Sequence, residues 1–451
     1  MRAARSHNLA LAHAVLIYRD ALIYSVLLTP VFVYLYNAVA GIGPQDIDLT
    51  DPSGNVIDQV FILTIFANSV LLAFLLRVPL QLFLLAILPF VFIMAWMVAS
   101  IGWSEFPSLT LRRASRELIE ITSIVLLALS LQSREAILSL LFRAFFVINL
   151  FNVASLAISS SFTPIGFAGI YLSKNTAGLA FACALPIFIV GIVDRTVSAS
   201  RLAAVFAFVT SSAMLILTTS KTAIGFTVIS LLMLLCTRIV VSRNVYGRVL
   251  APLMLLFAAL VSVVTILSLD VSEVLTAIFG DATFTGRDEV WRYALYKASG
   301  NPFQGVGYGA LWQVGGEVKT SLKNAEVRWI ANQAHNGYID IYAQLGYVGF
   351  VLLFVFLIHI FVRLLKYSST QESGTIFGLA SYTFYIFWGA IIYNITESSF
   401  FQGGEQMWIL LIFVCACVAR LLYNDLVVRR AGVEFGRLRR SWLRKAALSP
   451  D

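Results

Sequence analysis

Long apolar stretches separated by short polar ones dominate the pattern of this chain. Each apolar run of roughly 18 to 22 residues is long enough for a helix to cross a hydrocarbon core about 30 Å thick. We count about twelve runs, centred near residues 28, 67, 90, 124, 147, 185, 209, 231, 258, 353, 385 and 414. Apolar and polar positions do not alternate with a period of two, so helices are the remaining way to satisfy the backbone in lipid. The pattern predicts an all-α polytopic membrane protein with about twelve transmembrane helices.

One long polar segment interrupts this pattern, at residues 270–334, between the predicted ninth and tenth helices. Its first part predicts a helix. Thr285 is a candidate N-cap with Asp288 three residues later, and Gly300 and Pro302 end the helix. Its apolar face is Val290, Trp291, Ala294, Leu295 and Ala298. Arg287 then falls in the first turn, where unpaired backbone N–H groups and the helix dipole favour an anion.

Charge predicts the orientation. The chain is 59% apolar and 12% charged, with a net charge of +8. Most Lys and Arg residues fall in segments on the same side as the termini, which the positive-inside rule makes cytoplasmic. The first outer loop instead carries Asp46, Asp48, Asp51 and Asp58. We therefore expect one transmembrane domain over residues 1–451, a periplasmic loop at 270–334 and a basic cytoplasmic tail at 424–451. The tail suits an inner-leaflet anchor rather than nucleic-acid binding, and no cleavable signal is expected.

Two local patterns carry no special chemistry. The four cysteines lie within predicted spans and match no zinc or redox spacing, so we expect small apolar packing residues. They are Cys183, Cys236, Cys415 and Cys417. GVGYG at residues 305–309 reads as a flexible turn and not as a nucleotide fingerprint, because no strand precedes it. No repeat relates the two halves, which counts mildly against a transporter.

The strongest candidate for chemistry is His335, in NQAHNGYIDIYAQLG at residues 332–346. It lies where the long polar loop re-enters the membrane. A neutral imidazole could accept a proton from a sugar hydroxyl. A structural histidine that caps the next helix is an equal alternative.

Further polar segments fall on the same predicted face. They are WSEFPSLTLRRA (103–114), GIYLSKNTAG (169–178), TTSKTAIG (218–225) and Glu397 in NITESSF. Four basic residues there could bind a lipid diphosphate: Arg287, Lys221, Arg292 and Lys174. They could instead extend to phospholipid headgroups. Tyr308, Trp312, Trp329 and Tyr338 could stack on sugars or form an interfacial aromatic belt.

With these segments in this order, the chain resembles the O-antigen ligase and O-antigen polymerase superfamily, which includes bacterial exopolysaccharide polymerases. TFTGRDEVW (283–291) followed by NPFQGVGYG (301–309), and AHNGYIDIYAQLGYVG (334–349), carry the resemblance most strongly. It implies a glycosyltransferase that moves a glycan from undecaprenyl diphosphate to a sugar hydroxyl at the periplasmic face of the inner membrane.

By this resemblance His335 would activate or orient the acceptor hydroxyl, and Arg287 and Lys221 would hold the diphosphate. The family often has Arg at the position of Lys221, and many exopolysaccharide members have His at the position of Ser173. Arg292 and Lys174 are further candidate diphosphate ligands. The predicted supporting or glycan-binding residues are Asn175, Asn336, Tyr338, Trp312 and Glu397.

We expect no cofactor and no metal, because no Asp-x-Asp signature occupies a convincing outer position. The expected partners are the lipid-linked oligosaccharide, a glycan or lipid A core acceptor, membrane lipids and a chain-length regulator. A polymerase is slightly favoured over a ligase. A lipid-linked glycan flippase or transporter, or a sugar-binding scaffold of an export complex, are the alternatives from other classes.

Overall fold

The computed structural model describes residues 2–40, 56–198, 200–242, 287–312, 332–370 and 378–447. This part of the chain is helical apart from connecting turns and one two-stranded hairpin. The α-helices are α1 (Arg2–Leu27), α2 (Thr29–Ala40), α3 (Val56–Leu75), α4 (Leu80–Ala99), α5 (Pro107–Leu129), α6 (Arg134–Ser155), α7 (Lys174–Val193), α8 (Arg201–Leu217), α9 (Lys221–Ser242), α12 (Arg287–Ser299), α14 (Gly337–Thr370), α15 (Leu379–Thr396) and α16 (Gln406–Ala447). The hairpin pairs β1 (Phe162–Thr163) with β2 (Gly166–Phe167). The prediction of an all-α membrane protein is confirmed.

In the described part of the chain, six helices are long and apolar enough to cross a membrane, or up to seven if α1 and α2 form one broken span. Ten of the twelve predicted centres lie in helices, the centre near residue 28 falls at the break between α1 and α2, and the centre near residue 258 lies outside the described residues. The count of twelve spans stays a prediction, because helices such as α8 and α9 are shorter apolar segments by the same test.

The break between α1 and α2 bends the chain by 63°. Pro30 explains it, because proline has no N–H to donate to the carbonyl group four residues earlier. That carbonyl belongs to Val26, and the Thr29 hydroxyl donates to it at 2.8 Å. The predicted first span is therefore two helices rather than one straight helix.

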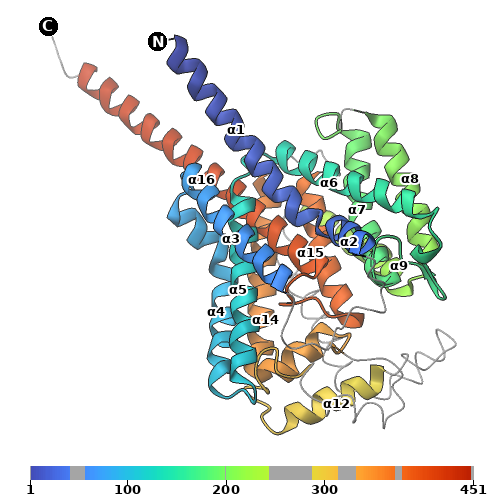
Figure 1. Cartoon of the computed structure of the whole chain (residues 1–451). Helices are drawn as coiled ribbons and strands as arrows, with labels where there is room; N and C mark the ends of the chain where they lie inside the picture. Colours follow the sequence, from blue (N-terminus) through green and yellow to red (C-terminus); the bar gives the residue numbers. More distant parts are fainter. Residues whose placement is uncertain are drawn as a thin grey trace.

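The membrane helices pack around α15, which is buried along most of its length and contacts α9, α14 and α16. On one side α4, α5 and α14 run side by side, and α7, α8 and α9 form the other side (Figure 1). The start of α1 and the end of α16 extend past the body at the same end, opposite α12. This arrangement puts both terminal helices on one side of the bundle.

The polar segment that holds α12 packs tightly where it is described. Val290, Trp291, Ala294 and Ala298 are buried and Leu295 is partly buried, which confirms the predicted apolar face. The predicted cap, Thr285, lies outside the described residues.

The segment at residues 305–309 is not the flexible turn that its glycines suggested. Its Gly307 N–H donates to the carbonyl group of Gln344 at 2.9 Å, and its Tyr308 hydroxyl donates to the carbonyl group of Phe401 at 2.6 Å. Gly305 has φ +70° and lies against the backbone of Gln344, where a Cβ would come within 2.4 Å of the carbonyl carbon. Glycine is required here by close packing as well as by backbone conformation.

The four cysteines lie in α7, α9 and α16 and form no disulfide. Three are buried, and Cys236 is exposed. The three buried cysteines agree with the expected packing role, and the exposed Cys236 does not.

Candidate functional site

Four segments that are distant in sequence meet at the α12 end of the bundle. They are the turn before α14, the first residue of α12, the start of α7 and the loop after α15. Each contributes one polar side chain: His335, Arg287, Asn175 and Glu397. We call these four residues the His335 cluster.

The Glu397 carboxylate is the centre of the His335 cluster. Its Oε2 lies 2.6 Å from Nδ1 of His335, and its Oε1 accepts from Nη2 of Arg287 at 2.9 Å and from Nδ2 of Asn175 at 2.8 Å. The carboxylate side chain is 5% exposed, against 21% for His335 and 14% for Arg287. Three donors therefore converge on one buried anion, which is the arrangement that a buried charge needs.

Burial alone would raise the pKa of Glu397. The hydrogen bond from His335 and the positive charge of Arg287 outweigh it, so that the pKa is lowered. Glu397 is thus an anion at neutral pH. A carboxylate next to Nδ1 favours the tautomer with the proton on Nδ1, which leaves the proton-accepting lone pair on Nε2.

Backbone contacts fix the turn that carries His335. The N–H of Gly337 donates to the carbonyl group of Glu397 at 3.1 Å, and the N–H of Asn336 donates to the Ser398 hydroxyl at 3.0 Å. The Asn336 side chain caps α14 by accepting from two backbone N–H groups of its first turn. Gly337 is packed so closely that a Cβ would lie 2.0 Å from Oδ1 of Asn394.

Asp340 holds the other side of the turn. Its Oδ1 accepts from the indole N–H of Trp312 at 2.6 Å, and its Oδ2 accepts from the backbone N–H of Ala334 at 3.0 Å. His335 itself has φ +49°, a left-handed conformation that is uncommon for residues other than glycine. Strain of this kind persists where the surrounding contacts determine the backbone, and it is frequent at functional sites.

The candidate diphosphate ligands occupy different settings. Lys221, the first residue of α9, is exposed, and next to it the Ser220 hydroxyl donates to Oδ1 of Asn175 at 2.8 Å. Lys174 instead donates to the carbonyl group of Ile165 at 3.1 Å. Arg292 pairs with two acids of its own helix, Glu289 at 2.6 Å and Asp288 at 3.2 Å. The structure brings Arg287 into the His335 cluster and leaves Arg292 and Lys174 paired elsewhere.

Two of the predicted glycan-binding aromatic residues, Trp312 and Tyr338, are buried inside the protein. Trp312 and Tyr338 are 4% and 2% exposed, and the Tyr338 hydroxyl donates to the carbonyl group of Ile391 at 2.9 Å. Buried rings offer no open face to a sugar. Sequence reasoning missed Ser220 and Asp340, which lie inside two motifs that it did single out.

No group of three or more His, Cys, Asp or Glu side chains in the described part of the chain could hold a metal ion. The first-loop acids Asp46 and Asp48 lie outside the described residues.

The sequence matches known proteins over the region of the site. A family model described as O-antigen ligase matches residues 206–354, which include Lys221, Arg287 and His335. The exopolysaccharide production protein ExoQ of Rhizobium meliloti (strain 1021) is 26% identical over 310 residues, which cover 63% of this chain and 68% of that protein.

Proposed function

We propose that this chain, a member of the O-antigen ligase and polymerase superfamily, transfers a glycan from a polyprenyl diphosphate carrier to a sugar hydroxyl. The periplasmic face of the bacterial inner membrane is the proposed place of reaction, and undecaprenyl diphosphate the proposed carrier. The observation that carries the proposal is the His335 cluster. It joins a candidate base, an anion that orients the base and a cation beside them.

His335 is the proposed general base. Glu397 holds the proton on Nδ1, so that Nε2 takes the proton of the acceptor hydroxyl as its oxygen attacks the anomeric carbon of the donor. The bond between that carbon and the diphosphate oxygen breaks, and the lipid diphosphate leaves with one additional negative charge. A positioned base of this kind typically contributes 10²- to 10⁴-fold to the rate.

Arg287 is the proposed stabiliser of the leaving diphosphate. Its Nη1 donates to the carbonyl group of Thr396 and its Nη2 to Glu397, so the guanidinium is held in place and keeps further N–H groups for the substrate. It also opens α12, where the helix dipole favours an anion. Lys221 adds an exposed positive charge next to Ser220, whose hydroxyl donates to Asn175. Preorganised cations directed at developing charge are among the largest contributions to catalysis.

Polymerase is the first candidate within the superfamily and ligase the second. The relative named above acts in exopolysaccharide production, which favours polymerisation, whereas the matching family model is described as a ligase. In a polymerase the acceptor is another carrier-linked glycan, and in a ligase it is the lipid A core.

Product size separates the two. The purified protein is incubated with its lipid-linked repeat unit alone, and then with lipid A core added. A ladder of products from the repeat unit alone supports a polymerase, and product only in the presence of the core supports a ligase. A protein that moves the lipid across a membrane unchanged in both conditions, and tolerates His335→Ala, would be a flippase or transporter.

A further inference from the structure

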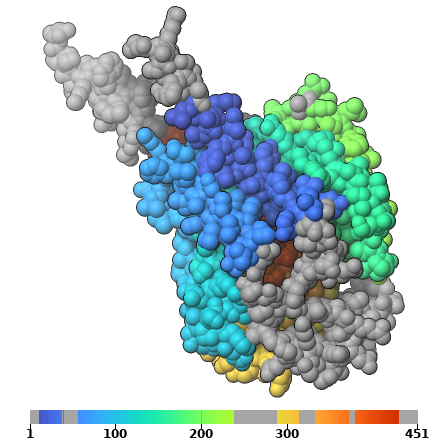
Figure 2. Space-filling model, in the orientation of Figure 1, coloured from blue at the N-terminus to red at the C-terminus, as the bar shows by residue number. Residues whose placement is uncertain are grey.

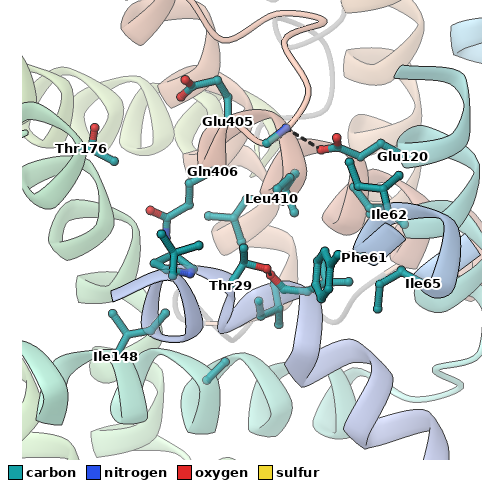
Figure 3. Close-up of a pocket in the computed structure, with 18 of the residues that line it drawn as sticks. Thr29, Phe61, Ile62, Ile65, Glu120, Ile148, Thr176, Glu405, Gln406 and Leu410 are labelled. Carbon is teal, nitrogen blue, oxygen red and sulfur yellow. Dashed lines mark hydrogen bonds between the residues drawn. The ribbon is translucent and has the colours of Figure 1, made fainter. Parts of the chain in front are cut away.

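A cavity of about 370 Å³ lies between the N-terminal helices and α16 (Figure 3). Its walls are mostly apolar and come from α1, α2, α3, α5, α6 and α16. Representative wall residues are Leu27, Ile65, Ala144, Ile148 and Leu410. The 63° bend at Leu28 sets both α1 and α2 against it. In Figure 2 a recess lies beside the blue N-terminal helices, with atoms of the C-terminal part of the chain at its bottom.

The cavity runs deep along the helices. On α6 its walls extend from Ile148 to Leu141, which are seven and fourteen residues before the helix end at Ser155. At 1.5 Å per residue the deeper point lies about 21 Å from that end, which exceeds half of a hydrocarbon core of about 30 Å. This depth and these walls suit a single hydrocarbon chain that lies along the helices.

One end of the cavity borders the His335 cluster. Thr176 lines the cavity and follows Asn175, which donates to Glu397. Glu405 also lines it, and belongs to the same loop between α15 and α16 as Glu397. A chain that filled the cavity would therefore direct its head group toward the proposed site of reaction.

The polar end of the cavity is not built to hold the diphosphate itself. Its cation, Arg116, pairs with Asp58 at 2.9 Å. Two other polar groups there, the Tyr171 hydroxyl and the Gln406 side chain, interact with each other. A head group at this end of the cavity lies beside Thr176 and Glu405, which neighbour the His335 cluster along the chain.

We propose that this cavity binds the isoprenoid chain of the lipid-linked substrate, and so aligns its diphosphate with Arg287 and Lys221. The inference rests on the proposed function and adds the site of the lipid. Binding cannot draw on the hydrophobic effect, because bulk lipid is as apolar as the cavity. It draws on packing contacts, which depend on the shape of the chain. The cavity therefore distinguishes a branched isoprenoid from a straight chain.

The test uses the same substitution at two positions of α6. Ala144 is 2% exposed and lines the cavity, whereas Ala154 is exposed and does not. Ala144→Leu adds three carbon atoms inside the cavity, and Ala154→Leu adds them outside it. Both variants are assayed in lipid nanodiscs with one glycosyl diphosphate on isoprenoid chains of several lengths and on a straight alkyl chain.

The wild-type protein should have a lower KM for long isoprenoids than for the straight chain. Ala144→Leu should raise the KM for long isoprenoids about tenfold, as expected for overpacking, with kcat within about twofold of wild type and the shortest chain unaffected. Ala154→Leu should behave as wild type. Equal KM values for isoprenoid and straight chains, or equal effects of the two substitutions, would overturn the proposal.

A second measurement covers the case in which Ala144→Leu does not fold. An isoprenyl diphosphate carrying a diazirine on its chain is photo-crosslinked to the wild-type protein, and the labelled peptides are identified. We expect label on α3 and α6 and none on α8. If turnover requires His335 but the label lies only on α8, the proposed lipid-binding role of the cavity is wrong and the proposed function stands. Turnover that persists in His335→Ala would refute the proposed function, wherever the label lies.

Discussion

Replacing Glu397 by glutamine should remove most of the activity and leave the fold in place. The change keeps the size of the side chain but removes its charge and turns one oxygen into an NH₂ group. In the structure both carboxylate oxygens act as hydrogen-bond acceptors. Oε2 faces His335, and Oε1 accepts from Arg287 and Asn175. A glutamine must therefore direct its NH₂ group at one or more donors, or accept from fewer of them.

The size of the effect can be worked from these contacts. A hydrogen bond to a charged group contributes roughly 1.5 to 3 kcal/mol, and loss of one partner of a buried ion pair costs about 3 to 5 kcal/mol. If about 3 kcal/mol of this loss falls on the transition state, the rate falls about 150-fold. A carboxylate that fixes a catalytic histidine can be worth about 10⁴-fold when its loss also admits the wrong tautomer. We expect kcat to fall between about 10²- and 10⁴-fold.

The assay is steady-state turnover of the lipid-linked repeat unit by purified protein, with thermal unfolding measured alongside. Glu105→Gln is the matched control, because Glu105 is an exposed acid of another outer segment. It should retain wild-type kcat. A Glu397→Gln variant that unfolds like wild type and turns over within about threefold of it would refute the role given to the carboxylate.

Four further outcomes are expected. Arg292→Ala and Lys174→Ala should each change kcat/KM less than about fivefold, because Arg292 pairs with Glu289 and Lys174 donates to the carbonyl group of Ile165, both outside the His335 cluster. Arg287→Ala should lower kcat/KM at least 100-fold, and equal losses in turnover assays would contradict this distinction. Gly337→Ala should lower the free energy of unfolding by roughly 1 to 3 kcal/mol, because the added Cβ would overlap the Asn394 side chain. Gly225→Ala should leave the melting temperature unchanged in the same experiment, because a Cβ there would meet open space. Burial first, and then the charge of Glu397, raises the pKa of Glu405 to about 7 from 4.5. Between pH 4.5 and 7 the folded state keeps the Glu405 proton that the unfolded state has lost, so the stabilisation by this proton is complete below about pH 4.5 and is lost as pH rises through 7. Glu405→Gln should therefore melt like wild type at pH 5 and at a higher temperature than wild type at pH 8. Equal melting temperatures of the two proteins at both pH values would count against this pKa. Turnover should persist in EDTA, and full loss of activity that magnesium or manganese restores would contradict a metal-independent transfer.

The sequence identified the members of the His335 cluster but not their connections. His335, Arg287 and Glu397 each stood out as polar groups beside membrane helices, and a shared face was predicted from the topology. The sequence did not predict that the Glu397 carboxylate contacts both His335 and Arg287. These two contacts join residues that are 62 and 110 positions apart in the chain.

Two differences between the predicted and observed structure follow from local sequence rules. Arg292 follows Glu289 and Asp288 by three and four residues, a spacing that pairs charges along one helix. Pro30 likewise indicated a break in the first predicted span. Other features depend on tertiary contacts and had no local signal: the left-handed backbone of His335, and the burial of Trp312 against Asp340.

The proposed glycan transfer is tested most directly by the release of polyprenyl diphosphate during the reaction. Purified wild-type protein and His335→Ala are incubated with the lipid-linked repeat unit, and phosphorus NMR measures free lipid diphosphate while product size gives the number of glycosidic bonds. We predict one lipid diphosphate released for each bond formed by the wild-type protein, and neither product from His335→Ala. Bond formation that continues without His335, or a carrier lipid that remains glycosylated after it has been moved, would contradict the account.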